Sequence, residues 1–264
     1  MIRVLVCDGI GTAGRTSNVI DPAVHHLTDD LNERGIEAVS EWIDYPAAML
    51  KLVGGNYTWQ QSSDMAVKLL VEEFQKYPDD KFVLMAYSGG NKPVHEFLEY
   101  FSRFHHQVVS VGFMSDPWRP EKKFQHDTPD PGGFGVCGQD AGPLEDRSFW
   151  TSVKGDPISG AAPDSLLRYV GDLGHGTPDQ MIRDAIIYFQ QGKFQLAAFL
   201  GLPFHEWFFG LGARINATAA EVQRYMSGWH TTYYTKPFKT SESDDRSLSV
   251  RFGATLSYAV RARI

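Results

Sequence analysis

Apolar runs that alternate with amphipathic segments fill the first 114 residues, and this alternation constrains the fold more than any other feature. Apolar strand candidates cover residues 2–7, 36–43, 81–88 and 107–114. Helix candidates between them cover residues 22–34, 62–77 and 91–104. Strands that alternate with helices are typical of a parallel sheet with helices on both faces. The sequence therefore predicts an α/β protein, with a further strand at 149–156.

Three later segments depart from this alternation. Residues 115–147 are rich in Pro, Gly and Asp, and we expect a long ordered surface loop near the functional site. Residues 177–226 lack a strand signal and predict a helical insertion within a main domain at 1–238. Residues 248–264 alternate strictly between apolar and other residues, which predicts a β-strand or hairpin in a C-terminal tail at 239–264. Such a strand would pair with the sheet edge or mediate self-association with another subunit.

The composition excludes several classes of protein. A net charge of −7 argues against nucleic-acid binding, because proteins that bind nucleic acids carry basic patches. Cys7 and Cys137 are too few for a disulfide framework or a zinc site, so we expect two thiols and no metal. No apolar run reaches the roughly 18 residues of a membrane span. The N-terminus lacks the pattern of a signal peptide.

The stretch LMAYSGGNKP places Ser88 between a predicted strand and a predicted helix. Ala86 and Gly90 stand two positions before and after it, where a nucleophile elbow needs small residues to avoid collisions. The helix that follows directs N–H groups and the positive end of its dipole toward this turn. We predict that Ser88 is a nucleophile and that the Gly89 N–H stabilises an oxyanion. A serine that only caps the helix is the alternative interpretation.

A serine nucleophile on this turn requires an acid and then a histidine further along the chain. His230 comes directly after the last predicted helix, where such a histidine is delivered. Asp156 ends the predicted strand at 149–156, and Asp116 follows the strand before it, so both are candidates for the acid. Other histidines lie on or beside amphipathic helices and are expected at the surface: His25, His26, His95, His105 and His106.

The N-terminal stretch MIRVLVCDGIGTAG carries Gly9, Gly11 and Gly14 in the spacing of a dinucleotide-binding loop. In such a site an acidic residue ends the second strand about 20 residues beyond the glycines. Asp44 instead lies 30 residues past Gly14, so an NAD-binding oxidoreductase stays a remote alternative and we expect no cofactor. In a hydrolase this loop supplies a second oxyanion donor, and we assign that role to the N–H of Ile10.

Six stretches resemble, in order, segments of the lysin B family of phage esterases, which are relatives of cutinases. LVCDGIGTAG stands where the family has a His-Gly-x-Gly loop after a strand, and FVLMAYSGG stands for its Gly-Tyr-Ser-Gln-Gly elbow. WHTTYYTKPF resembles its terminal His-x-Tyr-x-x-Tyr-Pro run. IDYPAAM, FMSDPWRPEKKF and VKGDPIS resemble the segments between these. The resemblance covers roughly residues 2–238 and includes the helical insertion.

The resemblance implies a cutinase-like α/β-hydrolase fold with a mostly parallel sheet. Carried over, it makes Ser88 the nucleophile, His230 the general base and acid, and Asp156 the residue that orients the imidazole. It implies hydrolysis of the ester between mycolic acid and arabinogalactan during phage lysis of mycolic-acid-containing bacteria. The partner is then a mycolyl-arabinogalactan or another lipid ester, with peripheral contact to a lipid envelope. Such a protein is made in the host cytoplasm without a signal peptide and acts on the cell envelope.

Three positions depart from the family pattern. Asp8 stands for a histidine in the first loop, Ala86 for the glycine before the elbow, and Gly89 for a glutamine after the serine. Two further interpretations stay open. One is a cutinase-like lipase or carbohydrate esterase that acts on smaller esters. The other is a binding protein that has the same fold and no catalytic activity.

Overall fold

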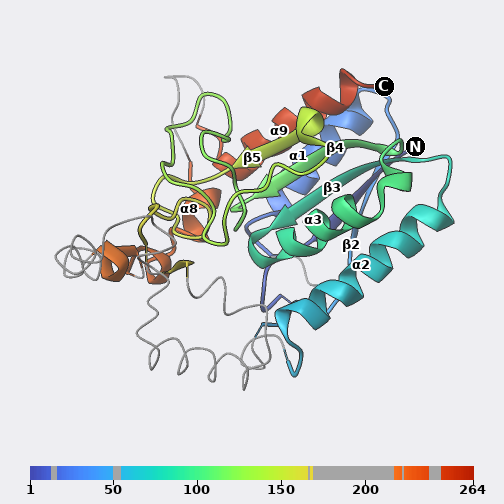
Figure 1. Cartoon of the computed structure of the whole chain (residues 1–264). Helices are drawn as coiled ribbons and strands as arrows, with labels where there is room; N and C mark the ends of the chain where they lie inside the picture. Colours follow the sequence, from blue (N-terminus) through green and yellow to red (C-terminus); the bar gives the residue numbers. More distant parts are fainter. Residues whose placement is uncertain (13–16, 50–54, 166, 169–216, 222, 238–244) are drawn as a thin grey trace.

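Five parallel strands form one sheet in the part of the chain that the structure describes (Figure 1). The computed structural model describes residues 1–12, 17–49, 55–165, 167–168, 217–221, 223–237 and 245–264. The strand order is β2-β1-β3-β4-β5, with bounds β1 Ile2–Cys7, β2 Ala38–Trp42, β3 Lys81–Tyr87, β4 Val108–Met114 and β5 Ser148–Thr151. All neighbouring strands pair in parallel, which confirms the predicted α/β class.

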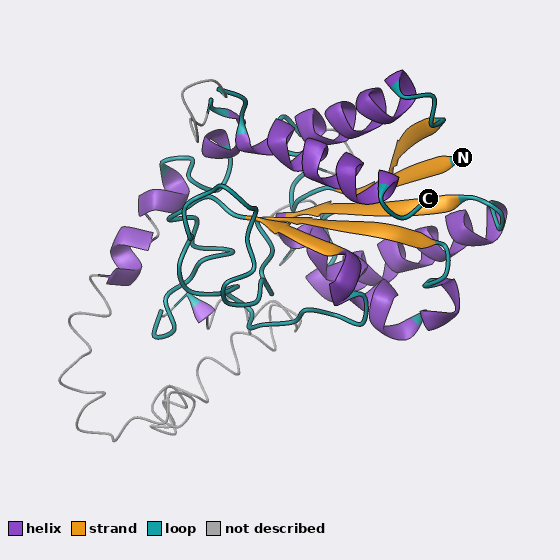
Figure 2. Cartoon of the chain, turned by 90° about the horizontal axis from the view of Figure 1, so that it is seen from above, coloured by secondary structure: helices purple, strands orange, loops and turns teal. Residues whose placement is uncertain are grey.

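Helices cover both faces of this sheet, as the view from above shows (Figure 2). The helix bounds are α1 Asp21–Glu33, α2 Trp59–Lys76, α3 Asn91–Tyr100 and α9 Leu248–Arg261. α1 and α9 pack on one face, and α2 and α3 pack on the other. Strand β3 is apolar on both faces for this reason: Met85 packs with α1 and α9, whereas Leu84 packs with α2 and α3.

Helix α2 begins three residues before the predicted start at residue 62. Thr58 caps it: the Thr58 hydroxyl accepts a hydrogen bond from the Gln61 N–H at 3.1 Å, and the Gln61 side chain accepts one from the Thr58 N–H at 3.0 Å. This reciprocal capping box satisfies two N–H groups that lack partners inside the helix. The first turn thereby places Trp59 beside the end of β3, where it contacts the site described below.

The predicted C-terminal strand is wrong, because residues 248–261 form helix α9. The buried positions Leu248, Phe252, Leu256 and Val260 recur every four residues. Residues four positions apart share one face of a helix, but they also share one face of a strand, because four is a multiple of two. The alternating pattern was therefore compatible with either a helix or a strand. Ser247 caps the helix by accepting a hydrogen bond from the Val250 N–H. The extended strand on which we based sheet-edge pairing and self-association is therefore absent.

Helix α9 packs closely against α1 and completes the core on that face of the sheet (Figure 1). A Cβ atom added to Gly253 would lie 2.3 Å from the carbonyl oxygen of Ala23 in α1. The Ser257 hydroxyl also donates a hydrogen bond to Asp30 Oδ2 at 2.6 Å. Glycine at position 253 is therefore required by the close approach of two helix backbones.

Gly253→Ala tests this packing. The added methyl group collides with the α1 backbone, so we expect the free energy of unfolding to fall by about 1–3 kcal/mol. Alanine in an open helix would instead raise it by about 1 kcal/mol relative to glycine. Urea denaturation measures the difference. Tyr258→Ala is the control, because Tyr258 is 69% exposed and its loss should change stability by less than about 0.5 kcal/mol. An unchanged or raised stability of Gly253→Ala would contradict the packing.

Most of the predicted helical insertion at 177–226 lies outside the described residues. The described pieces at 217–221 and 223–226 are helical. The predicted loop at 115–147 is confirmed, with a short 3₁₀ helix, η3 (Glu145–Arg147), at its end. Among the described helices, none combines the length and apolar character needed to cross a bilayer.

Candidate active site

Ser88 occupies a strained turn between β3 and α3. It begins the 3₁₀ helix η1 (Ser88–Gly90) and has a φ of +52°, which is unfavourable for a residue with a side chain. A Cβ atom on Gly90 would lie 2.2 Å from the Cys7 carbonyl oxygen, and one on Gly89 would lie 2.4 Å from the Ile10 side chain. A larger residue at position 90 would therefore collide with the backbone of β1, whereas one at position 89 would require the Ile10 side chain to move, and the turn holds Ser88 at the carboxyl edge of the sheet.

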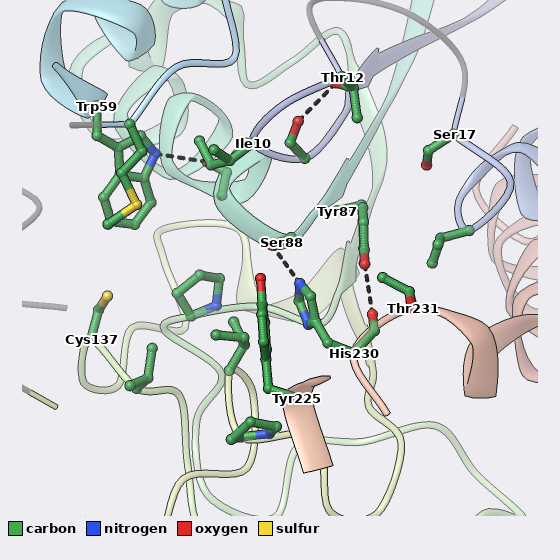
Figure 3. Close-up of a pocket in the computed structure, with 18 of the residues that line it drawn as sticks. Ile10, Thr12, Ser17, Trp59, Tyr87, Ser88, Cys137, Tyr225, His230 and Thr231 are labelled. Atoms are coloured by element: carbon green, nitrogen blue, oxygen red, sulfur yellow. Dashed lines mark hydrogen bonds between the residues drawn. The ribbon is translucent and has the colours of Figure 1, made fainter. Parts of the chain in front are cut away.

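His230 meets Ser88 although 142 positions separate them in the sequence. His230 Nε2 lies 2.8 Å from Ser88 Oγ (Figure 3). The imidazole is buried, and the rings of Tyr87 and Tyr225 stack on it with centroid distances of 5.2 and 5.1 Å. The Tyr87 hydroxyl also donates a hydrogen bond to the His230 carbonyl oxygen at 2.6 Å. These contacts fix both the backbone and the ring of His230.

Asp156 lies on the other side of the imidazole. His230 Nδ1 is 3.1 Å from Asp156 Oδ1, and the carboxylate is fully buried. It also accepts hydrogen bonds from the Tyr234 hydroxyl at 2.7 Å, the Ile158 N–H at 3.0 Å and the Ser115 hydroxyl. Burial alone would raise the pKa of Asp156, but the charge of His230 and these hydrogen bonds hold that pKa below its usual value. Asp156 is therefore an ionised acceptor for the imidazole.

The sequence pattern did not point to the partners of Asp156. Asp156 lies five residues past the end of β5 at Thr151, in a turn rather than at the end of the strand. Tyr234 reaches it from the short helix α8 (Thr232–Thr235), and Ser115 reaches it from the residue after β4. Tyr234 belongs to the stretch WHTTYYTKPF, so the tyrosines that follow His230 were the available signal.

Asp116, the other candidate acid, binds a different histidine. Its carboxylate lies 3.1 Å from His95 Nε2 and accepts hydrogen bonds from the Trp150 indole at 3.0 Å and the Trp118 N–H at 2.9 Å. His95 Nδ1 lies 3.5 Å from Asp140 Oδ2 in the loop at 115–147. His95 is only 8% exposed, so the predicted surface position is wrong. This pair joins α3 to the loop and takes no part in the contacts of Ser88.

The Ile10 side chain lies against Gly89, the residue that follows Ser88, and Figure 3 shows Ile10 near Ser88 at the cavity. The Gly89 N–H belongs to the first turn of η1, where N–H groups have no acceptor within the helix. The carbonyl oxygen of Gly89 accepts a hydrogen bond from the Trp59 indole at 3.1 Å. Gly89 is thereby held by two residues, through packing with the Ile10 side chain and through the hydrogen bond from Trp59.

Asp8, which stands for the histidine of the family pattern, organises the loop that carries Ile10. Its Oδ1 accepts hydrogen bonds from the Gly9 N–H at 2.7 Å and from the Ser17 hydroxyl at 2.9 Å. The Tyr45 hydroxyl donates to the Asp8 carbonyl oxygen. Burial raises the pKa of the Asp8 carboxyl to about 6 despite these hydrogen bonds. Although it replaces a histidine, Asp8 therefore anchors this loop from a buried position.

The glycines of the N-terminal loop serve packing and turn geometry. A Cβ atom on Gly9 would lie 3.0 Å from the Tyr87 ring, and Gly11 has a φ of +88°. Gly14 lies outside the described residues. Helix α1 begins only at Asp21, so its N-terminus does not follow the glycines directly as a dinucleotide-binding loop requires. This geometry does not favour the NAD alternative.

A cavity of about 580 Å³ opens beside Ser88 and His230. Its wall is mainly apolar and includes Ile10, Trp59, Val136, Ile158 and Leu167. Cys137 also lines the cavity, whereas Cys7 is fully buried in the core. The size and lining are typical of a site for an apolar small molecule or chain.

Comparison with known proteins identifies the fold. No protein-family model matches the sequence, and a search of curated proteins finds no match. The solved structure of lysin B from Mycobacteriophage D29 matches with a TM-score of 0.54 and 17% identity, over 82% of this chain and 88% of that one. The chain therefore shares the α/β fold of that structure.

Two other solved structures are similar at lower scores. An acetyl xylan esterase matches with a TM-score of 0.47 and 17% identity, over 69% of this chain and 97% of that one. A cutinase-like protein from Cryptococcus sp. matches with a TM-score of 0.46 and 11% identity, over 76% of this chain and 95% of that one.

His95→Asn tests whether the second histidine–carboxylate pair anchors the loop. Burial lowers the pKa of His95, but the charges of Asp116 and Asp140 and their hydrogen bonds to the imidazole together outweigh burial and raise that pKa from 6.5 to about 9. A raised pKa means that the folded state binds the proton more tightly than the unfolded state. The stabilisation is therefore complete below pH 6.5 and is lost as the pH rises through 9.

We expect His95→Asn to lower the free energy of unfolding by about 3 kcal/mol at pH 6, because it leaves a buried carboxylate without its cation. The difference from wild type should shrink at pH 10. Chemical denaturation at both pH values measures it. His126→Asn is the control, because the His126 side chain is 92% exposed. An equal destabilisation by His95→Asn at pH 6 and pH 10 would show that the charge of His95 is not responsible.

Proposed function

We propose that the chain is a serine hydrolase that cleaves carboxylic esters, with Ser88 as nucleophile, His230 as general base and Asp156 as the residue that orients His230. The observation that carries this proposal is the continuous hydrogen-bonded path from Ser88 Oγ through both imidazole nitrogens to Asp156, with distances of 2.8 and 3.1 Å. A serine at a strained strand-to-helix turn with such partners is typical of hydrolases that form an acyl-enzyme.

The reaction proceeds in two halves. His230 Nε2 takes the Ser88 proton while Oγ attacks the ester carbonyl carbon, and the negative charge develops on the carbonyl oxygen. The protonated imidazole then gives this proton to the leaving alcohol, and the acyl group stays on Ser88 Oγ. A water molecule, deprotonated by His230, attacks the acyl-enzyme, and the carboxylic acid leaves as the proton returns to Ser88.

The site supports both charged species of this reaction. Asp156 stays ionised and faces Nδ1, so it stabilises the imidazolium that forms when Nε2 accepts the proton. We assign the oxyanion donors to the N–H groups of Ile10 and Gly89, which lie beside Ser88. Loss of one such donor typically costs about 3 kcal/mol of transition-state stabilisation.

Ser88→Ala tests the chemistry. Without a nucleophile we expect kcat/KM for p-nitrophenyl butyrate to fall by about 10⁵-fold while the melting temperature stays near that of wild type. Ser227→Ala is the matched control, because the Ser227 hydroxyl donates to the Gln223 carbonyl oxygen at an exposed site outside the cavity. Similar rates for wild type and Ser88→Ala would contradict the proposal.

For the natural substrate we propose the ester between mycolic acid and arabinogalactan, cleaved during phage lysis. The ordered sequence resemblance to the lysin B family and the mainly apolar cavity support this substrate. The protein would then be made in the host cytoplasm and act at the cell envelope. The second candidate is a cutinase-like esterase for smaller esters, which the same cavity also favours.

Purified mycobacterial envelope material distinguishes the two substrates. Incubation with wild type should release free mycolic acids, detected by mass spectrometry, and incubation with Ser88→Ala should release none above the buffer control. An enzyme that hydrolyses p-nitrophenyl butyrate but releases no mycolic acid would favour the smaller esters and rule out the envelope substrate.

A further inference from the structure

The adjacent strands β3 and β4 are both followed by a serine with an unusual backbone conformation (Figure 1). Ser88 follows β3 with a φ of +52°, and Ser115 follows β4 with a φ of +48°. Glycine adopts this left-handed conformation readily, whereas a residue with a side chain is strained in it. Such strained residues cluster at functional sites. The proposed mechanism uses Ser88, but it gives Ser115 no role beyond a hydrogen bond to Asp156.

The two serine hydroxyls contact the two nitrogen atoms of one imidazole. Ser88 Oγ lies 2.8 Å from His230 Nε2, and Ser115 Oγ lies 2.9 Å from His230 Nδ1. The carboxylate oxygens of Asp156 lie 3.1 and 3.3 Å from Nδ1. Of these three oxygen atoms around Nδ1, the hydroxyl of Ser115 is therefore the nearest.

The direction of these hydrogen bonds follows from the proposed reaction. His230 Nε2 must accept the Ser88 proton, so the neutral imidazole carries its own hydrogen on Nδ1. The Ser115 hydroxyl therefore accepts from Nδ1–H and donates its own hydrogen to Asp156 Oδ2. A hydroxyl that donates to a carboxylate is a better acceptor, because hydrogen bonds in a chain polarise one another. Ser115 thus forms a second connection between His230 and Asp156, beside their direct contact.

The backbone around Ser115 holds this hydroxyl in place. Ser115 is fully buried, and its N–H donates to the Thr151 carbonyl oxygen at the end of β5 at 3.0 Å. The side-chain amide of Asn91, which is also fully buried, donates to the carbonyl oxygens of Ser88 at 2.7 Å and of Met114 at 3.1 Å. Asn91 thereby connects the turns that carry the two serines. One framework therefore sets the positions of both hydroxyls.

We propose that Ser115 is a positioning residue for the ester hydrolysis at Ser88, because its hydroxyl holds the Nδ1–H of His230 and connects it to Asp156. This inference rests on the proposed function. The contribution is largest when Nε2 has taken the Ser88 proton, since a hydrogen bond from an ionised donor is roughly twice as strong as one between neutral groups. Glycine would relieve the backbone strain at this position, but only a side chain with a hydroxyl can make this connection.

Ser115→Ala tests the role of the hydroxyl. The imidazolium loses a charge-assisted hydrogen bond, so we expect kcat for p-nitrophenyl butyrate to fall by about tenfold or more. Ser115 is not among the residues that line the described cavity, so KM should change by less than about twofold. Steady-state kinetics measure both values, and thermal melting shows whether the variant is folded.

Ser115→Gly keeps the test valid if the alanine variant fails to fold, because glycine fits a φ of +48° without strain. We expect it to lose kcat by a similar factor. Ser110→Ala is the matched control. Ser110 is a fully buried serine on β4 whose hydroxyl has no hydrogen-bond partner among the described residues, so its kcat should stay within about twofold of wild type. A wild-type kcat in a folded Ser115 variant would overturn the proposal.

A double-mutant cycle with Asp156→Asn distinguishes positioning of His230 from a general loss of structure. If Ser115 acts through the contact of His230 with Asp156, its hydroxyl should matter little once that contact is disrupted. After subtraction of the Ser88→Ala rate, we expect Ser115→Ala to lower kcat by less than about threefold in the Asp156→Asn background. An equal loss in both backgrounds would show that Ser115 acts independently of this pair, and it would overturn the proposal.

These outcomes are distinct from failure of the proposed function. If Ser88→Ala retains the activity of wild type, ester hydrolysis at Ser88 is wrong, and the role of Ser115 is wrong with it. If Ser88→Ala is inactive while both Ser115 variants keep the kcat of wild type, only the role of Ser115 is wrong.

Discussion

The close approach of the β3–α3 turn to the end of β1 is the constraint on which the site depends. No side chain fits between Gly90 and the Cys7 carbonyl oxygen, so these two backbone segments are in direct contact. This contact holds Ser88 at a positive φ, and the packing of the whole sheet offsets the strain. It also places the loop after β1 directly over Gly89, so the nucleophile and the proposed oxyanion donors share one rigid framework.

A buried carboxylate completes that framework at the other end of the hydrogen-bonded path. Asp156 is fully buried, and an ionised group in such a place has to be paired and hydrogen-bonded. Its partners Ser115, Tyr234 and His230 come from the end of β4, from α8 and from the loop before α8. The need to pair this one buried carboxylate therefore brings two separate parts of the chain, the end of β4 and the segment from His230 to Tyr234, to the carboxyl edge of the sheet.

The sequence predicted those parts of the molecule whose cause is local. The strands β1, β3 and β4 were placed within one residue at each end, because a strand buried on both faces is a short continuous apolar run between turns. The elbow at Ser88 was recognisable because its small neighbours and its place between strand and helix are all contained in ten residues. Among the predicted residues, His230 lies within hydrogen-bond distance of both Ser88 and Asp156.

The predictions that were wrong concern features that depend on contacts between residues far apart in the sequence. The α9 sequence satisfies both a period of two and a spacing of four, and its packing against α1 and the sheet favours the helix. His95 sits on an amphipathic helix, but whether it is exposed depends on Asp116 and Asp140, which lie 21 and 45 positions further along the chain. The role of Tyr234 beside Asp156 depends likewise on a contact between residues far apart in the sequence.

Tyr87 connects the two halves of the proposed machinery. It immediately precedes Ser88 in the sequence, and its hydroxyl holds the main-chain carbonyl of His230, 143 positions away. The location of the histidine is thus set by a strand of the sheet and by Asp156, rather than by the length of chain that leads to it. Evolution can therefore change the length of the chain between Ile158, which holds Asp156, and Tyr225, which stacks on His230, while the reactive geometry persists.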